Sequence, residues 1–247
     1  MTQGTGSRDA LLVSLVGIAL VAMAPWGAAA PFFQGLGDLP GGSFESSAHG
    51  VSADGSVVVG YSVSASGQEA FRWTLAGGLV SLGYIPGGSP GSEAYGVSSD
   101  GSVVVGMSLN ASWRPEAFRW TEATGMVSLG FLPEGGYGSQ ALGVSADGSV
   151  VVGSNTSSYG LQGFRWTGAA GMVGLGHVPG AGFETEASGV SADGSVVVGW
   201  GYNPSGQMEG WIASIRQDAA AVPEPASVML LLGGLAALAR RRRARAA

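Results

Sequence analysis

The stretch GVSADGSVVVG at residues 50–60 decides the fold of this chain, because it returns three times almost unchanged. Its four copies begin at Gly50, Gly96, Gly143 and Gly189, so the repeat is 46 or 47 residues long. A second run, FRWT, begins at Phe71, Phe118 and Phe164, and Trp211 takes the corresponding place in the fourth repeat. A fixed period of this length indicates one structural unit used four times.

Each repeat is predicted to form four short antiparallel strands. In the first repeat, one strand ends at residues 51–52 and the next covers residues 56–60. Asp54-Gly55 between them favours a tight hairpin turn, since these residue types tolerate positive φ. The third and fourth strands are expected at residues 70–74 and 79–82, and nothing in the body has a helical period.

The apolar pattern predicts sheets that are buried on both faces. Val57-Val58-Val59 is an unbroken apolar run, which is typical of a strand covered on both sides. The third strand alternates instead, so Phe71 and Trp73 are expected in the core and Arg72 outside it. The same expectation holds for the equivalent tryptophans, Trp120 and Trp166.

Four antiparallel strands in one such repeat match the blade of a β-propeller. The body opens with the end of a fourth strand near Leu36 and closes with a third strand at residues 211–215, so every strand type occurs four times. We therefore predict an all-β fold, a four-bladed β-propeller of 46–47-residue repeats closed by the N-terminal strand. That strand would complete the sheet of Trp211 and protect its edge. An open or differently closed β array is the alternative.

The repeats resemble the HAF family of extracellular repeats, named after a His-Ala-Phe triplet. This chain has Glu-Ala-Phe at residues 69–71 and 116–118, and Gln-Gly-Phe at residues 162–164. Because the triplet departs from the family's pattern, the resemblance depends on the whole period over residues 34–215. It implies an extracellular protein and assigns no biochemical activity.

The composition excludes several classes of function. Glycine supplies 45 of 247 residues, yet 45% of residues are apolar, so the glycines are interpreted as turn residues and not as disorder. Without cysteine, the chain has no disulfide, thiolate metal site or cysteine nucleophile. Lysine is absent, and residues 31–221 hold five Arg against fifteen acidic residues. This balance argues against a nucleic-acid partner, because phosphate binding needs Lys and Arg.

The N-terminus has the layout of a secretory signal peptide. Arg8 precedes an apolar run at residues 10–24, and the small residues 27–30 follow it. We therefore predict a signal helix within residues 1–30 that signal peptidase removes. An uncleaved anchor helix is the alternative.

The C-terminus carries a second and more specific pattern. Pro223-Glu224-Pro225 leads into the apolar residues 226–239. An arginine cluster follows at once, formed by Arg240, Arg241, Arg242 and Arg243. This tail resembles the PEP-CTERM sorting signal of Gram-negative envelope proteins. The resemblance implies that exosortase, a membrane peptidase, cuts near the Pro-Glu-Pro triplet and passes the protein to the cell surface or matrix.

The apolar part of the tail is short for a membrane span. Fourteen residues form a helix of about 21 Å, against a hydrocarbon core of about 30 Å. With its Pro-rich lead-in the segment is expected to span only just, and the arginines to stay on the cytoplasmic side. An ordinary tail anchor is the alternative.

These patterns divide the chain into five segments. They are a signal peptide (1–30), the repeat propeller (31–217), a linker with the Pro-Glu-Pro motif (218–225), a transmembrane sorting helix (226–239) and an Arg-rich cytoplasmic tail (240–247). We predict export through the inner membrane and transient anchoring by the C-terminal helix. The protein then resides in the cell envelope, at the outer surface or in the extracellular matrix.

One face of the predicted propeller is uniform. Its turns carry the equivalent residues Asp54, Asp100, Asp147 and Asp193. We interpret them as turn-forming residues and not as a cation site, because one Asp per blade supplies too few oxygens for Ca²⁺.

The opposite face differs from copy to copy. Its loops between second and third strands are expected at residues 61–68, 107–115, 154–162 and 200–208. The candidate ligand-contact residues on this face are Trp113, Tyr137, Tyr159, Trp200 and Tyr202. Rigid aromatic side chains among small polar groups suit adaptable recognition, including stacking on sugar rings. Unconstrained variation of surface loops is the alternative.

No catalytic motif stands out. His49 and His177 occupy different positions in their repeats, and His49 is expected to fill a variable strand position. Nucleophile elbows, phosphate loops and metal-spaced His pairs are absent from the sequence. We therefore expect no enzyme, cofactor or metal, and predict a non-catalytic binding module of the envelope or matrix that contacts polysaccharide. The alternatives are a purely structural surface protein and a polysaccharide-active hydrolase.

Overall fold

The computed structural model describes residues 33–177 and 184–214. Contacts divide the chain into Met1–Gly35 and Leu36–Ala247, and the fold below belongs to the second unit. The described residues form fifteen β-strands and no helix. The predicted all-β class is therefore confirmed.

The strands form four antiparallel sheets, and each sheet takes its strands from one repeat in chain order. The first contains β1 (Gly41–Val51), β2 (Val57–Ser64), β3 (Gly67–Thr74) and β4 (Gly78–Gly83). The second contains β5 (Ser92–Val97), β6 (Val103–Leu109), β7 (Pro115–Thr121) and β8 (Gly125–Gly130). The third contains β9 (Gly138–Val144), β10 (Val150–Ser157), β11 (Gly160–Thr167) and β12 (Gly171–Gly174). The fourth contains β13 (Thr185–Val190), β14 (Val196–Tyr202) and β15 (Met208–Ser214).

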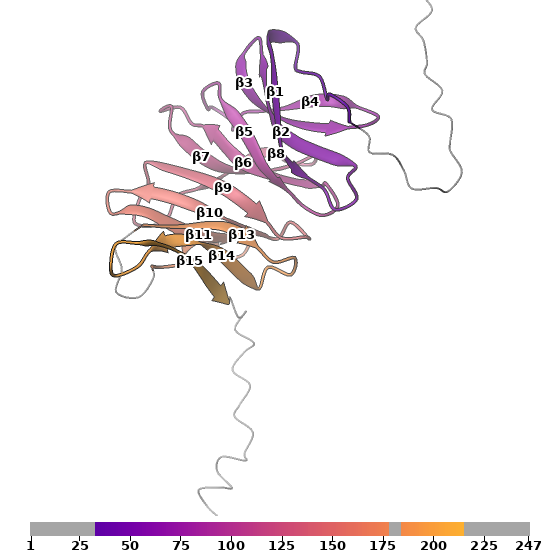
Figure 1. The fold of residues 1–247 in the computed structure, drawn as a ribbon. Helices are drawn as coiled ribbons and strands as arrows, with labels where there is room; N and C mark the ends of the chain where they lie inside the picture. The colour runs from indigo at the N-terminus through magenta and orange to yellow at the C-terminus, as the bar shows by residue number, and fades with distance from the viewer. Residues whose placement is uncertain (1–32, 178–183, 215–247) are drawn as a thin grey trace, which may run out of the picture. The chain divides into compact units, whose positions relative to one another are not determined.

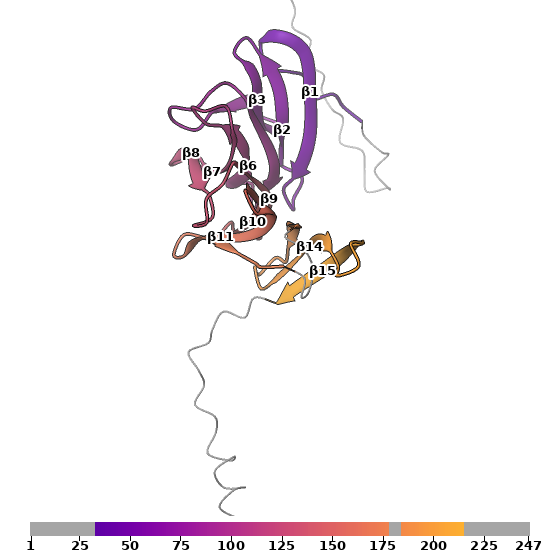
Figure 2. The same ribbon diagram turned by 90° about the vertical axis from the view of Figure 1, so that its left-hand side faces the viewer.

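The sheets stack face to face, and their first strands lie closest together (Figure 1, Figure 2). β1 contacts β5, β5 contacts β9 and β9 contacts β13, whereas the fourth strands of neighbouring sheets make few contacts. Because one edge of every sheet is close to its neighbour and the other edge is not, the sheets fan out from a common inner edge. This is a propeller-like arrangement.

The core lies between neighbouring sheets. Val59 of the first sheet packs with Phe118 and Met126 of the second, and equivalent residues fill the next interface. The three consecutive valines of β6 are at most 3% exposed. Burial on both faces is therefore confirmed for the two inner sheets, whereas Val58 of the first sheet is only partly buried and Val198 of the last is 44% exposed.

The phenylalanine and the tryptophan of the third strand differ in depth. The phenylalanines Phe71, Phe118 and Phe164 are fully buried. The tryptophans Trp73, Trp120 and Trp166 are only partly buried. The prediction that these tryptophans are core was wrong, because the strand ends one residue after each of them. Trp120 and Trp166 only border the buried clusters.

The predicted closure by the N-terminal strand is not formed in the described residues. The fourth sheet there has three strands, and Leu36 lies outside any strand. The segment that follows is held by the first sheet instead: Leu39 is 4% exposed, and its N–H donates to Ser62 Oγ at 2.9 Å. Both views show β1 and β15 at opposite ends of the stack (Figure 1, Figure 2). Over residues 33–177 and 184–214 the array is therefore open, as in the alternative considered from the sequence.

The predictions for residues 1–30, 218–225, 226–239 and 240–247 lie outside the described residues. Within residues 33–177 and 184–214, no helix is long and apolar enough to cross a membrane.

Candidate functional site

The aspartates of the uniform face are occupied by their own turns. Asp54 Oδ1 accepts hydrogen bonds from Ser52 Oγ (2.7 Å), Ser56 N–H (3.0 Å) and Ser56 Oγ (2.8 Å). These bonds, led by the Ser56 backbone, lower the pKa of Asp54 to about 2. The same pattern recurs at Asp100, Asp147 and Asp193. The interpretation as turn residues is supported, and the Asp-Gly turn is confirmed, with Gly55 at φ 73°.

On the opposite face the loops are shorter than expected, because the second and third strands extend into them. β2 continues to Ser64 and β14 to Tyr202, so Trp200 and Tyr202 lie in a strand. Their prediction as loop residues was wrong. Trp113 and Tyr159 do lie in connections, between β6 and β7 and between β10 and β11.

Trp113 is exposed in a strained backbone conformation. Its side chain is 66% exposed, and its φ is 60°, which is uncommon for a bulky residue. Asn110 holds the loop, because its Oδ1 accepts from Ser112 N–H (2.9 Å) and Arg114 N–H (3.2 Å). These bonds hold the backbone on both sides of Trp113.

The fourth repeat builds the same loop with a glycine at this place. Asn203 Oδ1 accepts from Ser205 N–H (3.0 Å) and Gln207 N–H (3.1 Å), and Gly206 has φ 74°. Glycine adopts this conformation without steric cost. A tryptophan at the equivalent position costs stability, and such outliers concentrate at functional sites.

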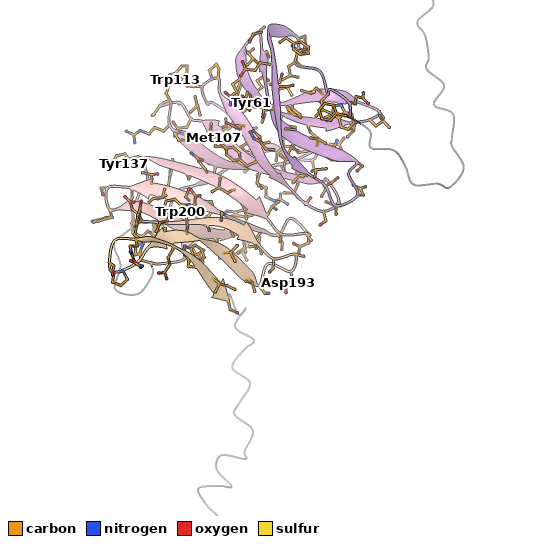
Figure 3. The ribbon with its side chains drawn as sticks, in the orientation of Figure 1. Tyr61, Met107, Trp113, Tyr137, Asp193 and Trp200 are labelled. Atoms are coloured by element: carbon orange, nitrogen blue, oxygen red, sulfur yellow. The ribbon has the colours of Figure 1, made fainter. Side chains whose placement is uncertain are left out.

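Two exposed tyrosines lie in other connections: Tyr137 between β8 and β9, and Tyr159 between β10 and β11. Tyr137 is 54% exposed, and Arg114 Cζ lies 5.3 Å from its ring centroid, in cation–π range. Tyr159 is 68% exposed and lines a cavity of about 210 Å³ together with Glu134, Ser157 and Gln162. Figure 3 places Trp113 and Tyr137 on one side of the stack and Asp193 on the other.

A second group of variable residues sits in the β-bulges between first and second strands. In each sheet the pairing skips one residue of the first strand, and these bulge residues are His49, Tyr95, Leu142 and Ser188. Bulges reorient a side chain and are common beside functional sites. Each bulge residue differs although the GVS run that follows is constant. The sequence showed this variable position, at His49 and its equivalents Tyr95, Leu142 and Ser188, but not that it forms a bulge.

The bulge residues of the first two sheets form an aromatic cluster. The His49 ring lies 5.7 Å from the ring of Tyr61 and is stacked at 5.9 Å on Tyr95. His49 Nδ1 lies 3.4 Å from Glu93 Oε1, and Gln68 Nε2 donates to Glu93 Oε2 at 3.1 Å. Burial, and next the Glu93 charge, raise the pKa of Tyr95. The cluster offers aromatic faces beside a carboxylate.

Trp200 and Tyr202 form a matching cluster on the last sheet. Their rings meet edge to face at 6.1 Å, and Trp200 Nε1 donates to Glu186 Oε1 at 2.9 Å. Tyr61, Met107 and Trp200 occupy equivalent strand positions and follow one another along the stack (Figure 3). The predicted residues are therefore divided: Trp113, Tyr137 and Tyr159 belong to the loops, and the Trp200–Tyr202 pair belongs to the strands.

The first comparison concerns the tail. Residues 221–243 match the PEP-CTERM protein-sorting motif. This match contains the predicted Pro-Glu-Pro triplet and arginines, and it implies export and surface sorting. The motif is a sorting signal that exosortase processes.

The second comparison concerns the body. No curated protein matches the chain. Among solved structures, TolB from Acinetobacter baumannii is similar with a TM-score of 0.52 at 16% identity, over 70% of this chain and 42% of that one. A protein described as a TolB from Agrobacterium tumefaciens has a TM-score of 0.49 at 16% identity, over 69% and 58%. This chain thus spans less than two thirds of either protein. The first likeness supports a propeller-like all-β fold and no activity.

Proposed function

We propose that the protein is a surface-sorted, non-catalytic binding module whose loop face contacts extracellular polysaccharide. The observation that carries the proposal is Trp113, an exposed indole held at φ 60° where the equivalent loop uses glycine. Packing within the protein repays little of the cost of this conformation, since the Trp113 side chain is 66% exposed.

Other groups on the loop face also suit a sugar ligand. Tyr137 and Tyr159 add two exposed rings, and Arg114, Ser157 and Gln162 add hydrogen-bonding groups. Aromatic rings supply apolar contact with little conformational entropy to lose, and small polar groups supply adaptable hydrogen bonds. The sorting tail supports a location at the cell surface, where an extracellular polysaccharide could be reached.

Replacing Trp113 with glycine separates binding from folding. The full chain is screened on a panel of purified bacterial polysaccharides, and the ligand found is titrated against Trp113→Gly. We expect affinity to fall at least about tenfold, as for loss of a buried aromatic contact, while the melting temperature stays the same or rises. Leu75→Ala, which removes an 82% exposed side chain on the turn side, is the control. Binding by Trp113→Gly as tight as that of the control would refute the loop face as the site.

A purely structural role is the second candidate, and the exposed end sheets favour it. Val51 is 60% and Val198 44% exposed on the outer faces of the stack, which suits assembly more than recognition of a soluble ligand. A chain that binds no polysaccharide and still assembles would support this role. A hydrolase would convert the panel polysaccharides, which reducing-end assays detect.

We also propose that the repeats are of the HAF type and that the sheets are blades of a propeller. The likeness to TolB supports the second statement at the level of the fold. Exosortase processing near Pro223-Glu224-Pro225 then releases the body from its membrane helix. Mass spectrometry of the surface-exposed protein would test that cut.

A further inference from the structure

The last sheet exposes a face that every other sheet buries. Val198 on β14 is 44% exposed, whereas its equivalents Val59, Val105 and Val152 are all 0% exposed, because a following sheet covers each of them. Ile212 beside it on β15 is 74% exposed. This end of the stack therefore exposes the face that, in the other sheets, packs against the sheet that follows.

The first sheet exposes the opposite half. Val51 on β1 is 60% exposed, whereas its equivalents Val97, Val144 and Val190 pack against the clusters formed with the preceding sheet. A Cβ added at Gly55 would meet open space, whereas one added at the equivalent Gly101 would collide with Val57 of the sheet before. The two ends are thus complementary halves of an interface that the chain itself forms three times.

Backbone hydrogen bonds also link the Asp-Gly turns of neighbouring sheets, from the first sheet to the last. Ala53 N–H donates to Ser99 O (3.0 Å), Ser99 N–H to Ala146 O (3.1 Å) and Ala146 N–H to Ala192 O (2.9 Å). Among the described residues no equivalent turn follows that of Ala192 and none precedes that of Ala53. The Ala192 N–H and the Ala53 carbonyl are therefore the groups to which a further turn on either side would bond.

The N-terminal segment, residues 33–39, bonds to the first sheet in the way that the end of β4 and the residues after it bond to the second sheet. Ser46 Oγ donates to Gly37 O at 2.6 Å, as Ser92 Oγ donates to Gly83 O at 2.7 Å where β4 ends. Leu39 N–H bonds Ser62 Oγ as Ile85 N–H bonds the equivalent hydroxyl one repeat later. The chain thus enters the first sheet as if three more strands preceded it.

The edge of β15 has room for such a strand. A cavity of about 170 Å³ there is lined by Leu175, Thr185, Trp211 and Ile212. At the equivalent place between earlier sheets lies a side chain of the fourth strand, Met126 or Met172. Each of these methionines lies four residues before the glycine of the Leu-Gly pair in its repeat, Gly130 or Gly176. Phe33 lies four residues before the equivalent Gly37.

We propose that a second copy of this chain continues the stack head to tail. The last sheet of one copy packs on the first sheet of the other, and residues 33–37 of the second copy add as the missing fourth strand on β15, with Phe33 in the cavity. The chain's own N-terminal segment does not do this, since Gly37 and Leu39 are bonded to the first sheet, at the far end from β15 (Figure 1). Two copies supply eight sheets, at the top of the range of about four to eight blades in closed propellers.

A head-to-tail contact joins two different surfaces, so variants of each surface must complement one another. The full chain, in a mild detergent, is studied by sedimentation velocity as wild type, Val51→Glu and Val198→Glu. We expect the wild type to assemble, each variant alone to stay monomeric, and the equimolar mixture to form a one-to-one complex through the two intact ends. Val127→Glu, on an exposed position of β8, should assemble as the wild type does.

Three outcomes overturn the proposal. They are a wild type that is monomeric at all concentrations, as a chain closed by its own N-terminus would be; assembly of either variant alone; and a mixture without a complex. Phe33→Asp tests the added strand: we expect association weakened at least about tenfold, from loss of a buried phenylalanine. Unchanged association of Phe33→Asp would refute the strand addition.

Discussion

At the scale of single residues, the turn aspartates link the stability of the body to pH. Their folded pKa of about 2 lies below the ordinary 3.8 because serine groups donate to them. A depressed folded pKa stabilises the fold above the unfolded value, and this stabilisation is lost as pH falls through the folded value. We therefore expect the free energy of unfolding to fall between about pH 4 and pH 2.

Urea unfolding across this pH range measures the effect. In the quadruple variant Asp54→Asn, Asp100→Asn, Asp147→Asn, Asp193→Asn, the amide oxygens still accept the serine bonds, so the acid-dependent part should shrink. Glu122→Gln, which removes an exposed carboxylate outside the turns, is the control. Equal acid sensitivity of the quadruple variant and the control would contradict the assignment.

The phenylalanine and the tryptophan of the third strand are expected to contribute differently to the free energy of unfolding. Phe118 is 0% exposed between the first two sheets, so Phe118→Ala should cost about 3–5 kcal/mol. Trp120 only borders that cluster, and Trp120→Ala should cost less. Chemical denaturation of both variants checks the order, and a larger loss for Trp120→Ala would mean that the strand register is misassigned.

At the scale of elements, the glycine of the VVVG run allows each bulge. A Cβ at Gly106 would collide with the backbone carbonyl of Glu93 on β5, and backbone cannot move aside as a side chain can. Gly106→Ala should therefore destabilise the protein by about 1–3 kcal/mol, as overpacking does. Gly168→Ala, with nothing within 4 Å of its Cβ, is the matched control. Thermal melts compare the two, and equal melting temperatures would contradict the close approach.

Most strands could be predicted from the sequence, because each begins or ends beside residues that favour a turn or a buried strand. The Asp-Gly turns and valine runs set the first hairpin of every repeat. The length of the second hairpin was missed, since Tyr61 and Trp200 continue a strand among polar residues that also suit a loop. The bulges were missed because one skipped residue leaves the apolar pattern of its neighbours intact.

At the scale of the whole molecule, the repeat predicted four stacked sheets but not whether the stack closes. Closure depends on the angle between neighbouring sheets, and equivalent residues of the repeat do not record it. Val105 and Val198 are the same residue at the same repeat position, yet a following sheet covers only Val105. The candidate site was predicted where a loop residue stood alone, as at Trp113. It was missed where residues far apart in the sequence meet in space, as where the His49 ring stacks on Tyr95 and contacts Tyr61.

An open stack also predicts how stability is distributed along the chain. Units in a linear array contact only their neighbours, so end units are held by one interface and inner units by two. In dilute protein, amide hydrogen exchange should therefore be slowest in β6 and β10, whose valines are buried on both faces, and faster in β1 and β15. Raising the concentration should slow exchange in the first and last sheets alone, because a second copy covers only those two sheets. Equal protection of all four sheets at every concentration would instead indicate a ring closed within one chain.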